Sequence, residues 1–238
     1  LIPINSNIVF RWNPYQLMFT TIQSLILASG SPRRQELLAR LGIEFTIVVP
    51  EVDESPTEGE GERDYVHRLA RLKGEAIGCT HPSSWVIAAD TVVIIDGRLL
   101  TKPDSEAQAV DMLMQLSGRE HQVRTGYCLY HMERSFCAID SVVSTVRFKP
   151  FGLDWAKSYV HTGEPMDKAG GYGIQDRGGV LVEAVEGSYS NVVGLPLAEL
   201  VELLCSQRVV IRDLALGLES GQHRRVQFLR QRDHLGHT

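Results

Sequence analysis

Short apolar runs alternate with helical periodicity along the chain from residue 24 onward. Runs that are wholly or almost wholly apolar at 25–28, 45–49 and 85–89 are typical of buried strands. Apolar residues at helical spacing over 32–41 and 65–77 predict two helices between these strands. The resulting order of strand, helix, strand, helix and strand is compatible with an α/β protein.

The second half of the chain carries turn and cap signals between further elements. Asp96 and Gly97 form a dipeptide favoured in type I′ turns, so residues 91–100 are predicted to form a hairpin. Ser105 followed by Gln108 is a capping box, which predicts a helix ending near residue 116. The remaining predicted elements are strands at 122–130, 136–148 and 180–185 and helices at 153–160 and 196–204.

Both ends of the chain differ from the region between them. Residues 1–23 show no period of 2 or 3.6, so we expect an irregular N-terminal extension. Since the chain begins with Leu, Met18 is a candidate natural start; the alternative is a genuine floppy extension. Residues 206–238 form an Arg-rich tail that we expect to be solvated. The residues between them, 24–205, are predicted to form one domain.

The composition is that of an ordinary globular protein. The 238 residues are 43% hydrophobic and 22% charged with a formal net charge of −5, which argues against disorder and against nucleic acid as a partner. No apolar stretch approaches the ~20 residues of a membrane span, and the N-terminus lacks the order of a signal peptide. The four cysteines are widely spaced without a CxxC pair, which favours reduced thiols in a cytoplasmic protein.

Residues 29–34 (SGSPRR) connect the first predicted strand to the first predicted helix. Helix N-termini attract phosphate because they offer unpaired N–H groups and the positive end of the helix dipole. Ser29 and Ser31 add hydroxyl donors, with Ser31 as the expected N-cap, and Arg33 and Arg34 add planar guanidinium groups. A phosphate-binding turn and a capped helix with two solvated arginines are equally compatible with this pattern.

Asp90 follows the apolar run 85–89, at the predicted C-terminal end of a buried strand. Open α/β sheets place ligands at that edge, so Asp90 and the adjacent Thr91 favour a functional role over a turn cap. Lys102, just after the hairpin, offers a point charge suited to phosphate, although a surface lysine is the default interpretation. Lys73 lies beside the apolar face of its predicted helix.

Two further segments carry polar chemistry. An acidic loop contains Asp53 and Glu54, and carboxylates together with phosphates hold Mg²⁺ or Mn²⁺. The glycine-rich segment 166–175 has a backbone able to follow a ligand closely. In it, Lys168 suits a phosphate contact, and Gln175 suits a base edge because its amide both donates and accepts. The alternatives are a solvated acidic loop and a plain glycine-rich turn.

Taken together, these motifs resemble the Maf family of nucleotide pyrophosphatases, also described as septum-formation inhibitor proteins. The resemblance covers about residues 25–204. Each motif alone is weak, but their order and spacing are specific. The segments that carry it are 27–38 (LASGSPRRQELL), 89–91 (ADT), 102–103 (KP), 116–118 (LSG), 167–175 (DKAGGYGIQ) and 193–197 (VGLPL).

The resemblance implies an α/β fold with a mixed sheet, in which two lobes flank a central cleft as in the inosine-triphosphate pyrophosphatases. It also implies hydrolysis of a nucleoside triphosphate to the monophosphate and pyrophosphate, with Mg²⁺ or Mn²⁺ as cofactor. Arg33, Thr91 and Gln175 resemble the dTTP/UTP subgroup, and modified pyrimidine nucleotides are further candidate substrates. The family's acidic position, where Glu is expected, matches Asp53 here.

On this resemblance, Asp90 is the expected general base. Lys102, Lys73 and the two arginines of the first motif would stabilise the leaving pyrophosphate, while Asp53 or Glu54 would hold the metal. Thr91 and Gln175 would bind the pyrimidine ring. The expected partner is the nucleotide, with neither nucleic acid nor membrane, and the family suggests a homodimer.

Two alternatives stay open. A non-catalytic nucleotide-binding regulator of cell division would use the same pocket. The carboxylate of Asp90 argues against it, because a pure binder gains little from a like charge beside phosphates. The second alternative is a Maf-like pyrophosphatase that acts on 7-methyl-GTP or purine nucleotides, which Gln175 does not exclude.

Overall fold

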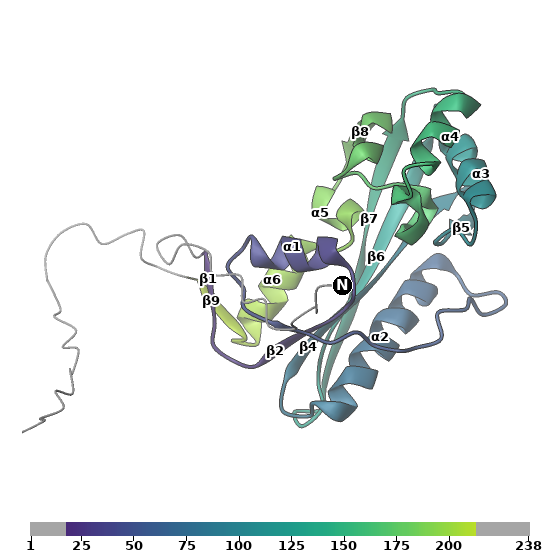
Figure 1. Ribbon diagram of the computed structural model, residues 1–238. Helices are drawn as coiled ribbons and strands as arrows, with labels where there is room; N and C mark the ends of the chain where they lie inside the picture. Colours follow the sequence, from purple (N-terminus) through teal and green to yellow (C-terminus); the bar gives the residue numbers. More distant parts are fainter. Residues whose placement is uncertain (1–17, 213–238) are drawn as a thin grey trace, which may run out of the picture.

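A mixed seven-stranded sheet forms the centre of the computed structural model, which describes residues 18–212 (Figure 1). Its strand order is β3-β2-β4-β6-β7-β8, and β5 pairs with β4. The strands are β2 (Leu25–Ala28), β3 (Thr46–Ile47), β4 (Trp85–Ile95), β5 (Arg98–Leu100), β6 (Glu120–His131), β7 (Phe136–Phe148) and β8 (Val182–Glu186). β2 runs parallel to β3 and β4, and the β4-β6-β7-β8 series is antiparallel. The expected α/β class with a mixed sheet is confirmed.

Helices cover both faces of the sheet. The α-helices are α1 (Pro32–Ala39), α2 (Glu62–Thr80), α3 (Glu106–Leu116), α4 (Leu153–Val160), α5 (Tyr189–Val193) and α6 (Leu197–Ser206). Three short 3₁₀ helices follow α4, namely η1 (Glu164–Asp167), η2 (Ala169–Gly171) and η3 (Arg177–Leu181). Among the described residues, no helix is long and apolar enough to cross a membrane.

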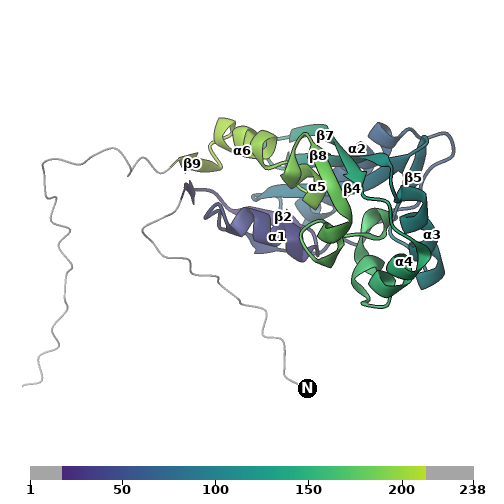
Figure 2. The same cartoon turned by 90° about the horizontal axis from the view of Figure 1, so that it is seen from above.

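Side-chain alternation along β4 divides the core between the two faces. Val86 and Ala88 pack in a cluster with α2, whereas Trp85, Ile87 and Ala89 pack in a cluster with α1 and α6. Accordingly, α2 lies along one side of the long strands, with α1, α5 and α6 along the other (Figure 1). Viewed from above, α3 and α4 gather at one end of the sheet and α6 lies toward the other (Figure 2).

Asp90 lies inside a strand rather than at its end, contrary to the prediction. β4 continues to Ile95 because β6 pairs along nearly its whole length and β5 pairs with its last residues. The parallel neighbour β2, however, ends at Ala28, whose partner is Ala88. Asp90 therefore lies just past the carboxyl end of the neighbouring strand β2. The expected position beside a strand end is correct, but the strand that ends there is β2 and not β4.

The structure confirms some of the caps and strands predicted from local sequence and changes others. The cap of α3 is confirmed, because the Ser105 hydroxyl accepts from the backbone N–H of Gln108 at 3.2 Å. Ser31 occupies the N-cap of α1 in an extended conformation, but its side chain makes no capping hydrogen bond. The Ser29 hydroxyl instead accepts from the Ser31 N–H at 3.2 Å. The predicted strand 45–49 shortens to β3, whose two residues are exposed because only β2 pairs with them.

A second, two-stranded sheet forms outside the predicted limits of 24–205. β1 (Phe19–Thr21) pairs antiparallel with β9 (Val210–Arg212). Phe19 and Val210 are buried in the cluster beneath α1 and α6, so regular structure reaches into the N-terminal segment expected to be irregular and into the tail expected to be solvated. The rest of those segments, 1–17 and 213–238 with most of the tail arginines, lies outside the described residues.

Candidate active site

A cavity of about 330 Å³ opens where the turn after β2 meets α2, β4 and the glycine-rich segment. Polar residues from distant parts of the chain line it. Ten of the twelve predicted site residues are among them, namely Ser29, Ser31, Arg33, Arg34, Glu54, Lys73, Asp90, Thr91, Lys102 and Lys168. Asp53 and Gln175 are not part of the lining.

Two carboxylates share one buried lysine at the centre of this site. Asp90 Oδ1 lies 2.6 Å from Lys73 Nζ, and both side chains are about nine-tenths buried. Lys73 Nζ also lies 2.7 Å from Glu54 Oε1, and Lys102 Nζ approaches Glu54 Oε2 at 3.9 Å. Burial by itself raises the pKa of Glu54, but the hydrogen bond and charge of Lys73 outweigh it and hold that pKa below its ordinary value.

A glycine in the adjacent strand permits this lysine–carboxylate contact. Gly126 of β6 is the register partner of Asp90. A Cβ at position 126 would lie 2.6 Å from the backbone oxygen of Val66, so only glycine lets α2 pack this closely on the sheet. Because Lys73 lies two turns further along α2, this packing brings its ammonium group to Asp90. Nothing in the local sequence pattern singles out Gly126 for this role.

Arg34 is engaged by the protein itself. Its Nε donates to the Gly194 carbonyl at 2.7 Å, and one terminal nitrogen donates to the Ala89 carbonyl at 2.8 Å and to the Ser29 hydroxyl at 3.2 Å. The other terminal nitrogen donates to Thr91 Oγ1 at 3.0 Å. Burial lowers the pKa of Arg34, and Asp90 partly offsets this effect. The guanidinium therefore ties the turn after β2 to β4 and to the segment after α5, with few donors left for a ligand.

The Thr91 side chain lies on the face of β4 opposite that of Asp90, where it belongs to a network of polar side chains. Its hydroxyl lies 2.9 Å from Thr125 Oγ1, and Thr125 in turn donates to the Asn191 carbonyl at 2.9 Å. The buried Asn191 amide donates to the Val123 carbonyl at 3.0 Å and to the Ser144 hydroxyl at 2.9 Å. The sequence prediction missed this network, because its members come together only when β6, β7 and α5 pack.

Arg33 and Lys168 both lie close to the exposed carboxylate of Asp167. Arg33 Nη1 lies 3.5 Å from Asp167 Oδ2, and Lys168 Nζ lies 2.7 Å from Asp167 Oδ1. Lys168 Nζ also donates to the Glu164 carbonyl at 2.6 Å. Desolvation raises the pKa of Asp167, but the two cations more than offset this and lower it. Unlike Arg34, Arg33 makes no hydrogen bond to another described residue, and its side chain lines the cavity.

The two remaining predicted residues, Asp53 and Gln175, are not part of the cavity lining. The Asp53 carboxylate is exposed and accepts from the backbone N–H of Ser55 at 2.9 Å. Hydrogen bonding to the side chain of Ser55, and then to its backbone, lowers the pKa of Asp53. Gln175 Oε1 is buried, with no hydrogen-bond partner among the described residues. Of the two candidate metal-binding carboxylates, only Glu54 reaches the cavity.

The donor set limits how a metal could be held. Within residues 18–212, no three His, Cys, Asp or Glu side chains gather as a metal-binding cluster. Mg²⁺ is commonly bound by one or two carboxylates together with substrate phosphates and waters. Glu54 and Asp90, which both contact Lys73, fit that arrangement, because the missing ligands are those a bound triphosphate would bring.

Comparisons with known proteins agree with the motifs. The family model described as Maf-like protein matches residues 24–207. A protein of Desulfotalea psychrophila named dTTP/UTP pyrophosphatase is 46% identical over 193 residues, 81% of this chain and 99% of that protein. One of the same name from Symbiobacterium thermophilum is 48% identical over 183 residues, 77% of this chain and 93% of that protein. Among solved structures, the Staphylococcus aureus Ham1 protein matches with a TM-score of 0.38 at 14% identity, over 53% of this chain and 72% of that one. The two sequence relatives and the family model confirm the resemblance: the chain belongs to the family of Maf-like proteins.

Proposed function

We propose that this protein hydrolyses dTTP and UTP to the nucleoside monophosphate and pyrophosphate. The names of its relatives, each aligned over nearly its full length, support this substrate class. The observation that carries the proposal is the contact of Asp90 with Lys73 in a cavity that Arg33, Lys102 and Lys168 also line. A carboxylate among several cations suits proton abstraction beside a polyphosphate.

In the proposed reaction, Asp90 is the general base. It takes a proton from a water molecule whose oxygen forms a bond to the α-phosphorus. The bond between that phosphorus and the bridging oxygen to the β-phosphate breaks, and pyrophosphate leaves with the bonding electrons. Lys73 fixes the orientation of the Asp90 carboxylate through its 2.6 Å contact with Oδ1, which leaves Oδ2 without a protein partner among residues 18–212.

The cationic residues have different roles in this proposal. Arg33, Lys102 and Lys168 would bind phosphate oxygens and stabilise the charge that grows on the leaving group. A divalent cation, Mg²⁺ or Mn²⁺, would be held by Glu54 with Asp90 and would neutralise further phosphate charge. Arg34, whose donors are largely taken by protein oxygens, would hold Ser29 and the backbone before Asp90 in place.

Thr91 and Gln175 are the residues predicted to bind the pyrimidine ring. Thr91 Oγ1 accepts from Arg34 and is hydrogen-bonded to Thr125, whose own proton goes to the Asn191 carbonyl, so the Thr91 hydroxyl has little capacity left for a base. We therefore assign Thr91 to the network that supports Arg34. Gln175 stays the candidate for base contact, since its buried Oε1 lacks a partner among the described residues. A homodimer and a cytoplasmic location stay predictions.

Pyrophosphate release from a panel of nucleoside triphosphates with Mg²⁺ or Mn²⁺ tests the proposal. We expect release from dTTP and UTP that is lost in Asp90→Asn and retained in Asp111→Asn, an exposed control on α3. Preference for 7-methyl-GTP or purine nucleotides would refute the substrate assignment. Nucleotide binding without release from any substrate would favour the regulator.

A further inference from the structure

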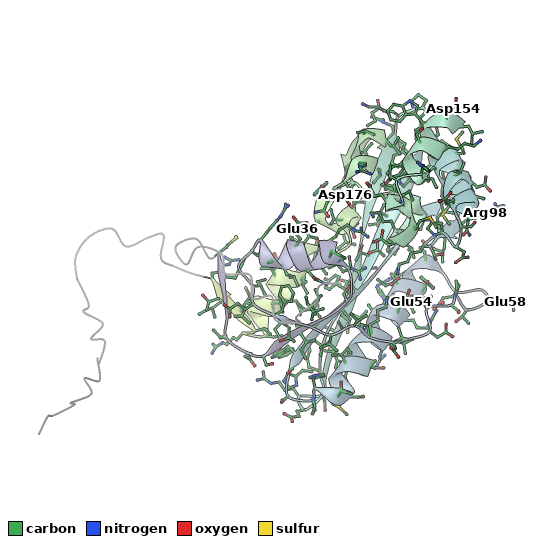
Figure 3. All side chains as sticks on the ribbon, viewed as in Figure 1. Glu36, Glu54, Glu58, Arg98, Asp154 and Asp176 are labelled. Atoms are coloured by element: carbon green, nitrogen blue, oxygen red, sulfur yellow. The ribbon has the colours of Figure 1, made fainter. Side chains whose placement is uncertain are left out.

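The loop between β3 and α2 brings Glu54 to the cavity without any regular structure of its own. Residues 48–61 contain neither helix nor strand, and most of their side chains are exposed. Long irregular loops in compact domains are commonly functional. Glu58 projects at the outer end of this loop, whereas Glu54 lies beside α2 (Figure 3). Some contact must therefore restrain the part of the loop that carries Glu54, because fixing such backbone has an entropic cost.

The first restraint is a hydrogen bond from the opening turns of α2. The Tyr65 hydroxyl donates to the backbone carbonyl of Glu54 at 2.8 Å. Tyr65 is only 3% exposed and packs with Leu69 and Val92 between α2 and β4. Burial, with Asp90 and Glu54 nearby, raises the pKa of Tyr65 to about 12, so its hydroxyl keeps its proton at neutral pH. Tyr65 thus donates from a rigid position.

The second restraint comes from Arg68, one turn further along α2. Its guanidinium makes a paired contact with Glu60, with Nε to Oε1 at 2.6 Å and Nη2 to Oε2 at 2.7 Å. Nη2 also donates to the Ser55 carbonyl at 3.0 Å, and the group lies 5.5 Å from the centre of the Tyr65 ring. Glu60 in turn accepts from the Thr57 N–H at 3.2 Å. Both ends of the loop segment that follows Glu54 are therefore anchored to the same helix.

We propose that Tyr65 and Arg68 are positioning residues that hold Glu54 at the cavity and thereby set the affinity for the divalent cation. This inference rests on the proposed function, in which Glu54 binds that cation. α2 carries Lys73 as well, so one rigid helix fixes both the lysine between the two carboxylates and the loop that supplies one of them. Neither side chain lines the cavity, so each acts through Glu54 and not on the nucleotide.

The test uses Tyr65→Phe, which keeps the ring and removes only the hydroxyl, and Arg68→Lys as a second variant. Tyr130→Phe is the matched control, because Tyr130 packs on α2 at Gly78, at the opposite end of the helix. Hydrogen exchange of residues 54–60 measures the restraint without any ligand. Binding of Mn²⁺, alone and with the α,β-imido analogue of dTTP, is measured by electron paramagnetic resonance.

We expect loop exchange to rise several-fold, up to about tenfold, in Tyr65→Phe, the effect of losing one hydrogen bond. Mn²⁺ affinity with the analogue should fall by a similar factor in both variants and stay unchanged in Tyr130→Phe. In turnover, the cation concentration for half-maximal rate should rise, while kcat at saturating cation stays within about twofold.

Unchanged exchange and unchanged Mn²⁺ affinity in both variants would overturn the inference. Faster loop exchange with wild-type Mn²⁺ affinity would also overturn it, because the loop would then not control the cation. Failure of the proposed function gives a different result: the wild-type protein would bind Mn²⁺ and the analogue but release no pyrophosphate from dTTP or UTP. Exchange and Mn²⁺ binding would still decide whether Tyr65 and Arg68 position Glu54.

Discussion

Two adjacent arginines in one motif should respond to the same substitution in different ways. Arg34→Met removes the guanidinium that donates hydrogen bonds to the carbonyls of Gly194 and Ala89, at 2.7 and 2.8 Å. A buried acceptor left without its donor costs about 1–3 kcal/mol. Two such acceptors lose their donor, but the variant no longer has to desolvate the partly buried charge of Arg34, which offsets part of that cost. The expected net loss in the free energy of unfolding is about 2–3 kcal/mol.

Arg33→Met is the matched control. Arg33 makes one ion pair at 3.5 Å with an aspartate that is 61% exposed, and such pairs are worth about 0–1 kcal/mol. For a domain of this size, each kcal/mol corresponds to about 2–4 °C in Tm. Arg34→Met should therefore melt about 5–10 °C below wild type, whereas Arg33→Met should melt near wild type and show a raised KM for dTTP.

Thermal and urea denaturation followed by far-UV circular dichroism provide the measurement. Unfolding of Arg34→Met within about 0.5 kcal/mol of wild type, a difference typical of surface substitutions, would refute the structural role of Arg34. An equal loss of stability in Arg33→Met would also refute the contrast, since the two side chains would then share a structural role.

Three further predictions concern packing, pH dependence and thiol reactivity. Gly126→Ala should destabilise the fold by about 1–3 kcal/mol and reduce turnover, because the added Cβ would meet the Val66 oxygen at 2.6 Å; unchanged denaturant midpoint and kcat would contradict this. Burial lowers the pKa of His121 to about 4, so the unfolded chain binds the proton first, and stability should be full above about pH 6.5 and fall between pH 6.5 and 4. His121→Gln should flatten that slope in pH-dependent denaturation, and an unaltered slope would contradict the assignment. A hydrogen bond with a buried thiol lowers the pKa of the exposed Cys137 to about 7, so mass spectrometry should find it alkylated by iodoacetamide at pH 7 before the exposed Cys79; the reverse order would contradict this.

Features set by neighbouring residues were predictable from the sequence. The turn between β4 and β5 has positive φ at both central residues, 52° at Asp96 and 71° at Gly97, as the Asp-Gly dipeptide predicted. The cap of α3 and the two longest strands likewise follow from local pattern. The motifs also identified most residues that line the cavity, because each motif lies where an element ends or two strands part.

Features that depend on packing between distant segments were not predictable. Arg33 and Arg34 are chemically identical, and only the position of the carbonyls at 89 and 194 separates their environments. The sequence pattern predicts a strand end at Asp90, because the polarity of this residue interrupts an apolar run. β6 continues beside it, and the side-chain alternation turns it toward Lys73 on α2. Similarly, Asp53 and Glu54 are sequence neighbours, but Tyr65 and Arg68 determine which carboxylate reaches the cavity.

The most direct test of the central claim is hydrolysis of dTTP in ¹⁸O-labelled water, with mass analysis of both products. Attack at the α-phosphorus by a water that Asp90 deprotonates places the label in dTMP and leaves the pyrophosphate unlabelled. Asp90→Asn should abolish formation of both products. Label in pyrophosphate or in inorganic phosphate, or wild-type turnover in Asp90→Asn, would contradict the account.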